Sequence, residues 1–181
     1  MNRDQEFAMV KDCQRGDKKA LDTLVRQLQT PVYNAAYRIL GSADEAADVT
    51  QTTFLKVFEN IHRFDPKYRL FSWTYRIAVN EAVDQLRRRK RVETLKDAPK
   101  SDTDQPQEMA ATAQLSREVQ VTLMELTEDQ RAVIVLHYFS DCSYKEIGHI
   151  LELPEKTVKS RLFAARQQLK SKLQQRGVFS P

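Results

Sequence analysis

Glycine is scarce in this chain, with only four among 181 residues. Alternating runs of β-branched residues, the pattern of half-buried strands, are also scarce. No glycine-rich phosphate loop is present, and the three histidines, His62, His137 and His149, lack the spacing of a metal site or a catalytic triad. These absences argue against a β-rich fold and against an enzyme. We expect an all-α protein with no cofactor, no metal and no small-molecule substrate.

Cysteine is rarer still, since Cys13 and Cys142 are the only two. Neither belongs to a CxxC or Cys/His pattern, and the simplest explanation is a reduced compartment in which both thiols are structural. The N-terminal segment MNRDQEFAMVKDC has no apolar core of a signal peptide, and no apolar run approaches the ~18 residues of a membrane span. We therefore expect a cytoplasmic protein that does not insert into a membrane.

The sequence does contain charge and helical periodicity. Charged residues make up 30% of the chain, hydrophobic residues 41%, and the formal net charge is +4, as in ordinary globular proteins. Apolar residues recur at helical spacing in two blocks, residues 1–91 and 115–181. Residues 92–114 are rich in Asp, Pro, Ser, Thr and Gln, which is typical of a flexible linker. We expect two small helical domains joined by this linker.

Helix start signals divide the two blocks further. Thr30 followed by Pro31 predicts that a new helix begins there, with Thr30 as its N-cap. Three other helices are predicted to begin with a capping box, in which a Ser or Thr pairs with a Glu or Gln three residues later. These pairs are Ser42 with Glu45, Thr127 with Gln130 and Ser143 with Glu146. Long helices are also predicted over about residues 72–91 and 155–175.

The segment SYKEIGHILELPEKTVKSRLFAARQQLKSKL has the layout of a helix-turn-helix. Residues 156–176 contain seven basic residues and no acidic one. The predicted buried stripe of the second helix is Val158, Leu162, Ala165, Leu169 and Leu173. The opposite side presents Lys156, Thr157, Lys159, Ser160, Arg161, Phe163 and Arg166. Such a face suits phosphates and major-groove base edges, whereas a merely solvated amphipathic helix would not need the turn pattern.

A second segment combines aromatic and basic residues. Five aromatic residues fall within twelve positions: Phe64, Tyr68, Phe71, Trp73 and Tyr75. Basic residues are interleaved with them: Arg63, Lys67, Arg69 and Arg76. Aromatic faces accept unstacked bases at ~1–3 kcal/mol each, while basic residues hold the nucleic-acid backbone, and the run RRRKR at residues 87–91 could follow duplex phosphates. The alternative is that the rings fill a helical core, above all Phe64 and Trp73.

The order of these parts resembles an extracytoplasmic-function (ECF) sigma factor, the two-domain class of bacterial transcription initiation factors. The matching stretches are GDKKALDTLV, QTTFLKVFENI, FSWTYRIAVNEAVDQLRRRKR and LTEDQRAVIVLHYFSDCSYKEIGHILELPEKTVKSRLFAARQQL. The resemblance covers nearly the whole chain. It implies a protein without catalysis of its own, which binds core RNA polymerase and directs it to promoters. A stand-alone helix-turn-helix regulator is the alternative.

The resemblance implies three sets of binding residues. The helix at about residues 42–61 would dock on the clamp helices of the polymerase β′ subunit through Glu45, Asp48, Gln51, Thr52, Leu55 and Glu59. The first domain would melt the −10 element and capture it as single strand through Phe64, Lys67, Tyr68, Arg69, Phe71, Trp73, Arg76, Asn80, Arg87 and Arg88. The second domain would bind the −35 element as duplex, beside the polymerase β flap, through the exposed face of the second helix named above.

The predicted docking helix departs from the family pattern at its threonines. Thr52 stands where the family usually has a glutamate, and Thr50 where it has an apolar residue. A helical wheel places Thr50 on the core-facing stripe, Thr53 on the flank and Thr52 among the acidic residues of the partner-facing side. Phosphorylation would add about −1.5 to −2 charges and restore the missing carboxylate. We rank Thr52 first, Thr50 second and Thr53 third, with neutral drift as the alternative, and expect a Ser/Thr protein kinase or an anti-sigma factor as regulators.

Overall fold

The structure is a computed structural model that describes residues 3–96 and 111–178, and all regular structure in these two ranges is helical. The first range contains α1 (Arg3–Gln14), α2 (Lys18–Leu40), α3 (Ala43–Asn60), the short 3-10 turn η1 (Ile61–Arg63) and α4 (Leu70–Lys96). The second contains α5 (Ala111–Met124), α6 (Glu128–Ile134), the π-helical turn η2 (Val135–Phe139), α7 (Tyr144–Ile150) and α8 (Glu155–Gln175). The predicted all-α fold is confirmed.

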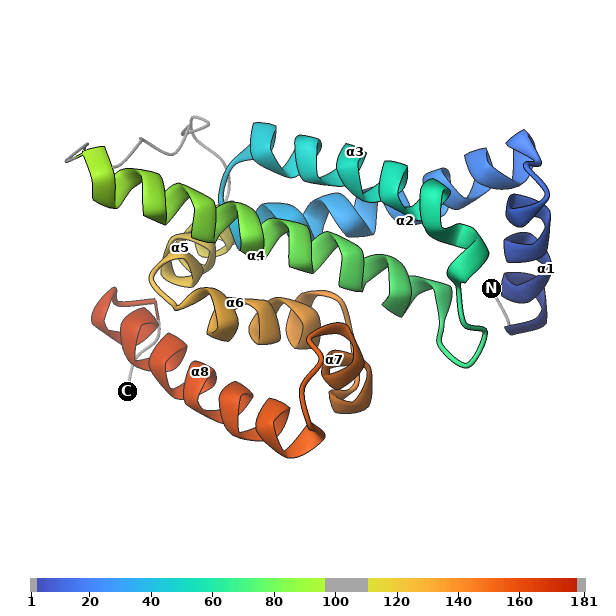
Figure 1. The fold of residues 1–181 in the computed structure, drawn as a ribbon. Coiled ribbons are helices and arrows are strands. Elements are labelled where there is room, and N and C mark those ends of the chain that lie inside the picture. Colours follow the sequence, from blue (N-terminus) through green and yellow to red (C-terminus); the bar gives the residue numbers. More distant parts are fainter. Residues whose placement is uncertain (1–2, 97–110, 179–181) are drawn as a thin grey trace.

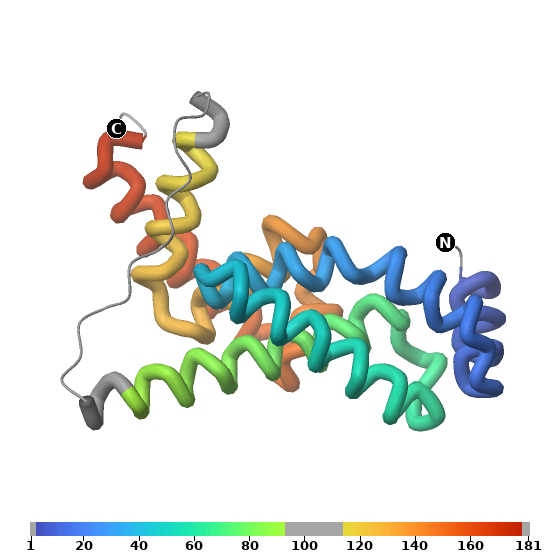
Figure 2. Tube along the Cα trace, turned by 90° about the horizontal axis from the view of Figure 1, so that it is seen from above, coloured from blue at the N-terminus to red at the C-terminus, as the bar shows by residue number. Residues whose placement is uncertain are grey.

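Helices α2, α3 and α4 pack side by side, and α1 crosses the end of this bundle next to the connection between α3 and α4 (Figure 1). Helices α6 and α7 lie against the opposite side of α4 from α3, and α8 packs on α6 and α7 farther from α4 (Figure 1). Seen from above, α5 and α8 stand together at the end of the molecule away from α1 (Figure 2). The predicted linker falls partly outside the described residues, but its flanks, residues 92–96 and 111–114, are helical ends of α4 and α5.

The predicted helix start at Thr30 is wrong, because α2 runs through Pro31 without interruption. Pro31 lacks an amide hydrogen, which normally costs about 3 kcal/mol in a helix interior. Buried residues lie on both sides of it, Leu24 before and Val32 after, and one long helix keeps them on a single face. Burial of this continuous stripe outweighs the lost hydrogen bond.

Helix α3 begins as predicted, with the Ser42 hydroxyl accepting a hydrogen bond from the Glu45 amide at 3.3 Å. The reciprocal half of the predicted capping box is missing, because the Glu45 carboxylate instead pairs with Arg89 of α4 at 3.1 Å. The wheel prediction is correct for Thr50, which is 7% exposed, but Thr53 is fully buried and not on the flank. Packing in the bundle therefore buries a larger part of the α3 circumference than the positions of its apolar residues predict.

The second block forms the predicted helix-turn-helix from α7 and α8. Both predicted capping boxes are present in full, Thr127 with Gln130 and Ser143 with Glu146. Gly148 of α7 is required by close packing, because a Cβ there would lie 2.8 Å from the Leu153 carbonyl oxygen of the turn. The predicted apolar stripe of α8 is confirmed, with Val158, Leu162, Ala165 and Leu173 buried and Leu169 half-buried.

A single apolar core continues through both helical blocks. Ile39 and Val79 of the first block belong to the same buried cluster as Leu123, Ile147 and Leu162 of the second. A smaller cluster, which includes Val10, Leu24 and Phe64, holds α1 to its end of the bundle. The two blocks are therefore packed on each other, a relation that the linker composition did not indicate.

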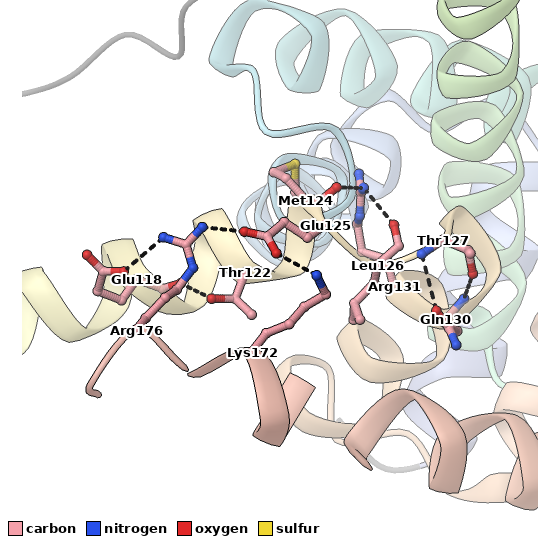
Figure 3. A network of polar contacts seen from close by, with 10 residues as sticks. All are labelled: Glu118, Thr122, Met124, Glu125, Leu126, Thr127, Gln130, Arg131, Lys172 and Arg176. Carbon is pink, nitrogen blue, oxygen red and sulfur yellow. Dashed lines mark hydrogen bonds and ion pairs between the residues drawn. The ribbon is translucent and has the colours of Figure 1, made fainter. Parts of the chain in front are cut away.

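Arg131 of α6 joins segments from both blocks, and Figure 3 shows its contacts with Met124 and Leu126. Its side chain is 5% exposed, and its guanidinium donates to the carbonyls of Leu123, Met124 and Leu126, which close α5, and of Ile39 near the end of α2. Nearby, the Glu125 carboxylate accepts hydrogen bonds from Lys172 and Arg176 of α8, which lower its pKa (Figure 3). No helix in residues 3–96 or 111–178 is long and apolar enough to cross a membrane.

Candidate nucleic-acid and polymerase-binding surfaces

Helix α8 turns a basic face to solvent. Lys156, Lys159, Ser160, Phe163 and Arg166 are exposed. Phe163 is 63% exposed, an unusual state for so large an apolar side chain. Because α7 and the core hold the opposite stripe of α8, these side chains stand on one rigid surface. A basic helix of this shape can enter the major groove and contact phosphates and base edges.

The other two predicted residues of this face, Thr157 and Arg161, are half-buried. Arg161 pairs with Asp129 of α6 at 3.1 Å. Lys159 pairs with Glu155 within α8 at 2.8 Å, and the hydrogen bond that its ammonium donates to this carboxylate raises the pKa of Lys159. Arg161 is therefore already occupied by an acidic group, whereas Lys156 and Arg166 extend into solvent beside it.

The aromatic residues after α3 divide into core and surface. Phe64 is 8% exposed and packs edge-on against Trp73, with ring centroids 5.5 Å apart. Phe71 is half-buried and lies 4.2 Å from the Tyr75 ring. Tyr68, with 43% of its surface exposed, is the one exposed ring among the five of this stretch. Phe64 thus lies in the core, the alternative given for it above, whereas Phe71 packs against Tyr75 and stays partly exposed, and its contact with a base stays a prediction.

Basic residues surround Tyr68 and continue along α4. Lys67 and Arg69 are exposed in the loop, and Asn80, Arg87 and Arg88 are exposed on the helix. Arg88 pairs with Glu81 at 3.0 Å, and Glu81 also accepts a hydrogen bond from Lys56, which lowers its pKa. The half-buried Arg76 pairs with Glu152, in the turn between α7 and α8. Of the predicted −10 residues on α4, Arg76 and Arg87 therefore face the second block, whereas Arg88 lies with Glu81 beside Lys56 of α3.

The predicted docking face lies on the side of α3 that turns away from the bundle. Asp48, Gln51, Leu55 and Glu59 are exposed along it at helical spacing. Leu55 is 54% exposed, so an apolar side chain stands among acidic and polar ones. Glu45 is half-buried and engaged with Arg89. This face fits a partner that is basic at its rim and has an apolar depression at its centre.

The sequence matches two family descriptions in order along the chain. Residues 24–92 match Sigma-70 region 2, and residues 116–169 match Sigma-70 region 4. The ECF RNA polymerase sigma factor SigW of Bacillus subtilis is 32% identical, with the alignment covering 91% of this chain and 94% of the relative. The ECF RNA polymerase sigma-E factor of Haemophilus influenzae is 33% identical over 92% of this chain and 94% of the relative. The chain belongs to the ECF sigma factors.

Solved structures of sigma factors share the fold. Sigma factor RpoE in complex with the anti-sigma factor NepR, from Bartonella quintana, superposes with a TM-score of 0.74, 25% identity and coverage of 86% of this chain and 98% of that chain. CnrH in complex with the cytosolic domain of CnrY gives a TM-score of 0.73, 26% identity and coverage of 93% and 97%. In this ECF sigma factor, region 2 spans α2 to α4 and region 4 spans α5 to α8.

The threonines of α3 differ in accessibility. The Thr50 hydroxyl donates to the Ala46 carbonyl, and the Thr53 hydroxyl donates to the Val49 carbonyl, each at 2.7 Å. Both side chains are buried, whereas Thr52 is half-buried beside Asp48 and Gln51 on the exposed side. Of the three candidates, Thr52 is the one that a modifying enzyme could reach without opening the helix. Phosphorylation of Thr52 in this sigma factor stays a prediction.

Sequence reasoning missed the role of α1 in this sigma factor. Arg3 donates hydrogen bonds to the carbonyls of Pro66 and Lys67 in the loop, at 3.3 and 3.1 Å. Glu6 is 5% exposed, and its carboxylate accepts a hydrogen bond from the Leu70 amide, the first residue of α4. Helix α1 therefore holds both the loop and the start of α4. The available signal was the acid at position 6, one turn before Val10 on the buried face of α1.

Glu6→Ala is expected to lower the free energy of unfolding by about 1–3 kcal/mol, because the Leu70 amide at the start of α4 loses its buried acceptor. Urea denaturation measures the loss. Glu6→Gln retains an acceptor oxygen and should be clearly less destabilised. Asp4→Ala, an exposed acid on the same helix, serves as the control. Equal stability of the Glu6→Ala and Asp4→Ala variants would contradict the proposed contact.

Proposed function

We propose that this ECF sigma factor recruits core RNA polymerase to promoters by contacting both promoter elements with the surfaces described above. The exposed basic face of α8 binds the −35 element as duplex. The loop around Tyr68 and the adjoining side of α4 melt the −10 element and hold it as single strand. The observation that carries this proposal is the combination, in one chain, of regions 2 and 4 with a rigid basic helix face and an exposed aromatic–basic loop.

The division of labour follows the two helical blocks. We assign residues 1–91 to polymerase binding and −10 capture, residues 92–114 to the linker and residues 115–181 to −35 binding. The exposed face of α3 docks on the β′ clamp helices, and region 4 lies near the β flap. Polymerase supplies the chemistry of RNA synthesis. Phosphorylation of Thr52 adjusts the charge of the α3 face, and an anti-sigma factor is a second regulator that would compete for the same surfaces.

Promoter-directed transcription with purified core polymerase tests this function. Lys159→Ala should reduce initiation about tenfold at a promoter with an intact −35 element, because a good contact to a base edge is worth ~1–3 kcal/mol. Lys172→Ala is the matched control, since it removes the same charge from α8 on the side that faces Glu125. The loss of initiation caused by Lys159→Ala should be smaller at promoters whose −35 element has been scrambled.

A stand-alone regulator would give a different result. It would bind its duplex site tightly without polymerase, and adding polymerase would not create promoter-specific initiation. Failure of the wild-type chain to bind core polymerase, together with tight binding of duplex by the free protein, would overturn the sigma-factor mechanism proposed here.

A further inference from the structure

We infer that α1 is a positioning element for base selection at the −10 element, and that it acts by holding the loop of residues 64–69 (the −10 loop) through Arg3 and Glu6. This inference rests on the proposed function, because it concerns the same capture of the −10 element as single strand. Helix α1 precedes the residues that match Sigma-70 region 2, which begin at residue 24. Promoter selection in this chain thus depends on a segment outside that match.

Helix α1 contacts the connection between α3 and α4 at several points. At the end of α1, the Gln14 side chain donates a hydrogen bond to the Ile61 carbonyl, where η1 begins, at 3.0 Å. At its start, one nitrogen of the Arg3 guanidinium donates to both the Pro66 and the Lys67 carbonyls, at 3.3 and 3.1 Å. The contacts therefore reach from η1 to the middle of the −10 loop, at the end of the bundle that α1 crosses (Figure 1).

Glu6 holds the other end of the −10 loop. It is 5% exposed, and one of its carboxylate oxygens accepts a hydrogen bond from the Leu70 amide. The other oxygen lies 3.6 Å from the guanidinium of Arg69, one of the basic residues that we assign to the −10 strand. A buried carboxylate is costly without such partners. Glu6 therefore favours a single position for the start of α4 and for this arginine.

The backbone of the −10 loop forms a turn of its own. The Tyr68 amide donates to the Asp65 carbonyl at 3.1 Å, and the Lys67 amide donates to the Asp65 carboxylate at 3.0 Å. Pro66, between them, has no amide hydrogen to donate. Such a turn fixes the local shape of the loop but not its position relative to α4, and irregular loops are more mobile than the elements that they connect. The contacts from α1 supply the missing restraint.

The position of this turn determines the space beside Tyr68, the exposed ring that we assign to the single strand. A hollow of about 190 Å³ lies there, with Pro66 and Tyr68 on the loop side and Arg3 and Phe7 on the α1 side. Selective recognition requires contacting groups to be held within about 0.5 Å of their productive geometry, whereas stacking on a ring accepts every base. A loop released from α1 would still bind single strands but would select less between bases.

Arg3→Ala tests this role in the holoenzyme of the full chain with core polymerase. The probe is one promoter at which the wild type initiates, together with each single-base replacement in its −10 element. The measured quantity is the ratio of initiation rates between the original promoter and each replacement, which is about 5- to 150-fold for a recognised base. A loss of active protein cancels in this ratio, so a variant that is merely destabilised leaves it unchanged.

Arg15→Ala is the matched control, because Arg15 is an exposed arginine just after α1 and pairs with Asp12 at 3.1 Å. We expect Arg3→Ala to reduce the largest ratio about fivefold, the lower end of the cost of a mismatched base, and Arg15→Ala to leave every ratio unchanged. Glu6→Gln keeps an acceptor for the Leu70 amide but removes the charge beside Arg69, and it should lower the same ratio. The salt dependence of promoter binding by Arg3→Ala should keep the wild-type slope, because no phosphate contact is lost.

Wild-type ratios in Arg3→Ala would overturn the inference. It would also be overturned if this variant weakened initiation equally at every replacement and lowered the salt slope by about one, which is the result of losing a phosphate contact. Failure of the proposed function looks different. In that case the wild-type chain itself would fail to initiate at any promoter with core polymerase, or would initiate with no preference between bases of the −10 element.

Discussion

Arg131→Met is expected to lower the free energy of unfolding by about 3–5 kcal/mol, because it removes a buried charged group and leaves its partners unpaired. The guanidinium donates to carbonyls that close α5 and to the Ile39 carbonyl near the end of α2. Burial lowers its pKa to about 10, so it remains protonated at neutral pH. Methionine fills part of the space but offers no donor to any of these oxygens.

Urea denaturation followed by circular dichroism measures this effect. Arg26→Met is the matched control, since Arg26 is exposed and forms only an i,i+4 pair with Asp22 at 2.8 Å, a type of pair worth about 0.3–0.5 kcal/mol. Arg131→Lys should fall between the two, because an ammonium group keeps the charge but cannot reach all the carbonyls in the planar geometry of a guanidinium. A loss for Arg131→Met no larger than that of Arg26→Met would refute this account of the interface.

Thr52→Glu is expected to raise promoter-directed transcription by unmodified protein at least about fivefold, which corresponds to about 1 kcal/mol. Thr52 lies between Asp48 and Leu55 on the exposed side of α3. A carboxylate there extends the acidic face that we assign to the polymerase clamp helices. Phosphorylation would add more charge than glutamate and stronger acceptors for arginine. The glutamate variant therefore gives a lower bound for the effect of a kinase.

The measurement compares wild type, Thr52→Glu and Thr52→Ala with purified core polymerase and no kinase. Thr23→Glu is the control, because Thr23 is an exposed threonine on α2, away from the α3 face. Strong initiation by unmodified wild type and by Thr52→Ala would contradict activation by phosphorylation of Thr52. The threonines of α3 would then be neutral substitutions. If every variant is silent, binding to core polymerase is measured next, and absence of binding would contradict the proposed docking of the α3 face.

Short-range sequence patterns predicted much of the architecture. The capping boxes at Thr127 and Ser143, the start of α3 at Ser42 and the buried stripe of α8 depend on residues within one or two turns of each other, so spacing alone predicts them. The order of the motifs was enough to indicate a sigma factor. The exposed residues of α8 and α3 followed as well, because a helix with one apolar face must turn its other face to solvent or to a partner.

Other features could not be predicted, because they depend on residues distant in the sequence. Pro31 inside α2 is tolerated only because buried residues on both sides of it belong to cores built by other helices. Phe64 is an aromatic residue beside basic ones in the sequence, as expected of a base-stacking residue, but it lies in the core against Trp73. Arg3 contacts a loop, and Glu6 the start of α4, more than sixty positions away. In each case a neighbour that spacing cannot reveal decides the role of the residue.

The sequence by itself therefore determined most of the helices, the buried stripe of α8 and the family, since these depend on periodicity and on motifs. Only the tertiary structure decided how the two blocks meet. The pairing of Tyr68 with His149, the sharing of Asp129 by Arg87 and Arg161, and the burial of Arg131 all join helices from different parts of the chain. Contacts of this kind arise from the shape of two folded surfaces, and no local pattern encodes that shape.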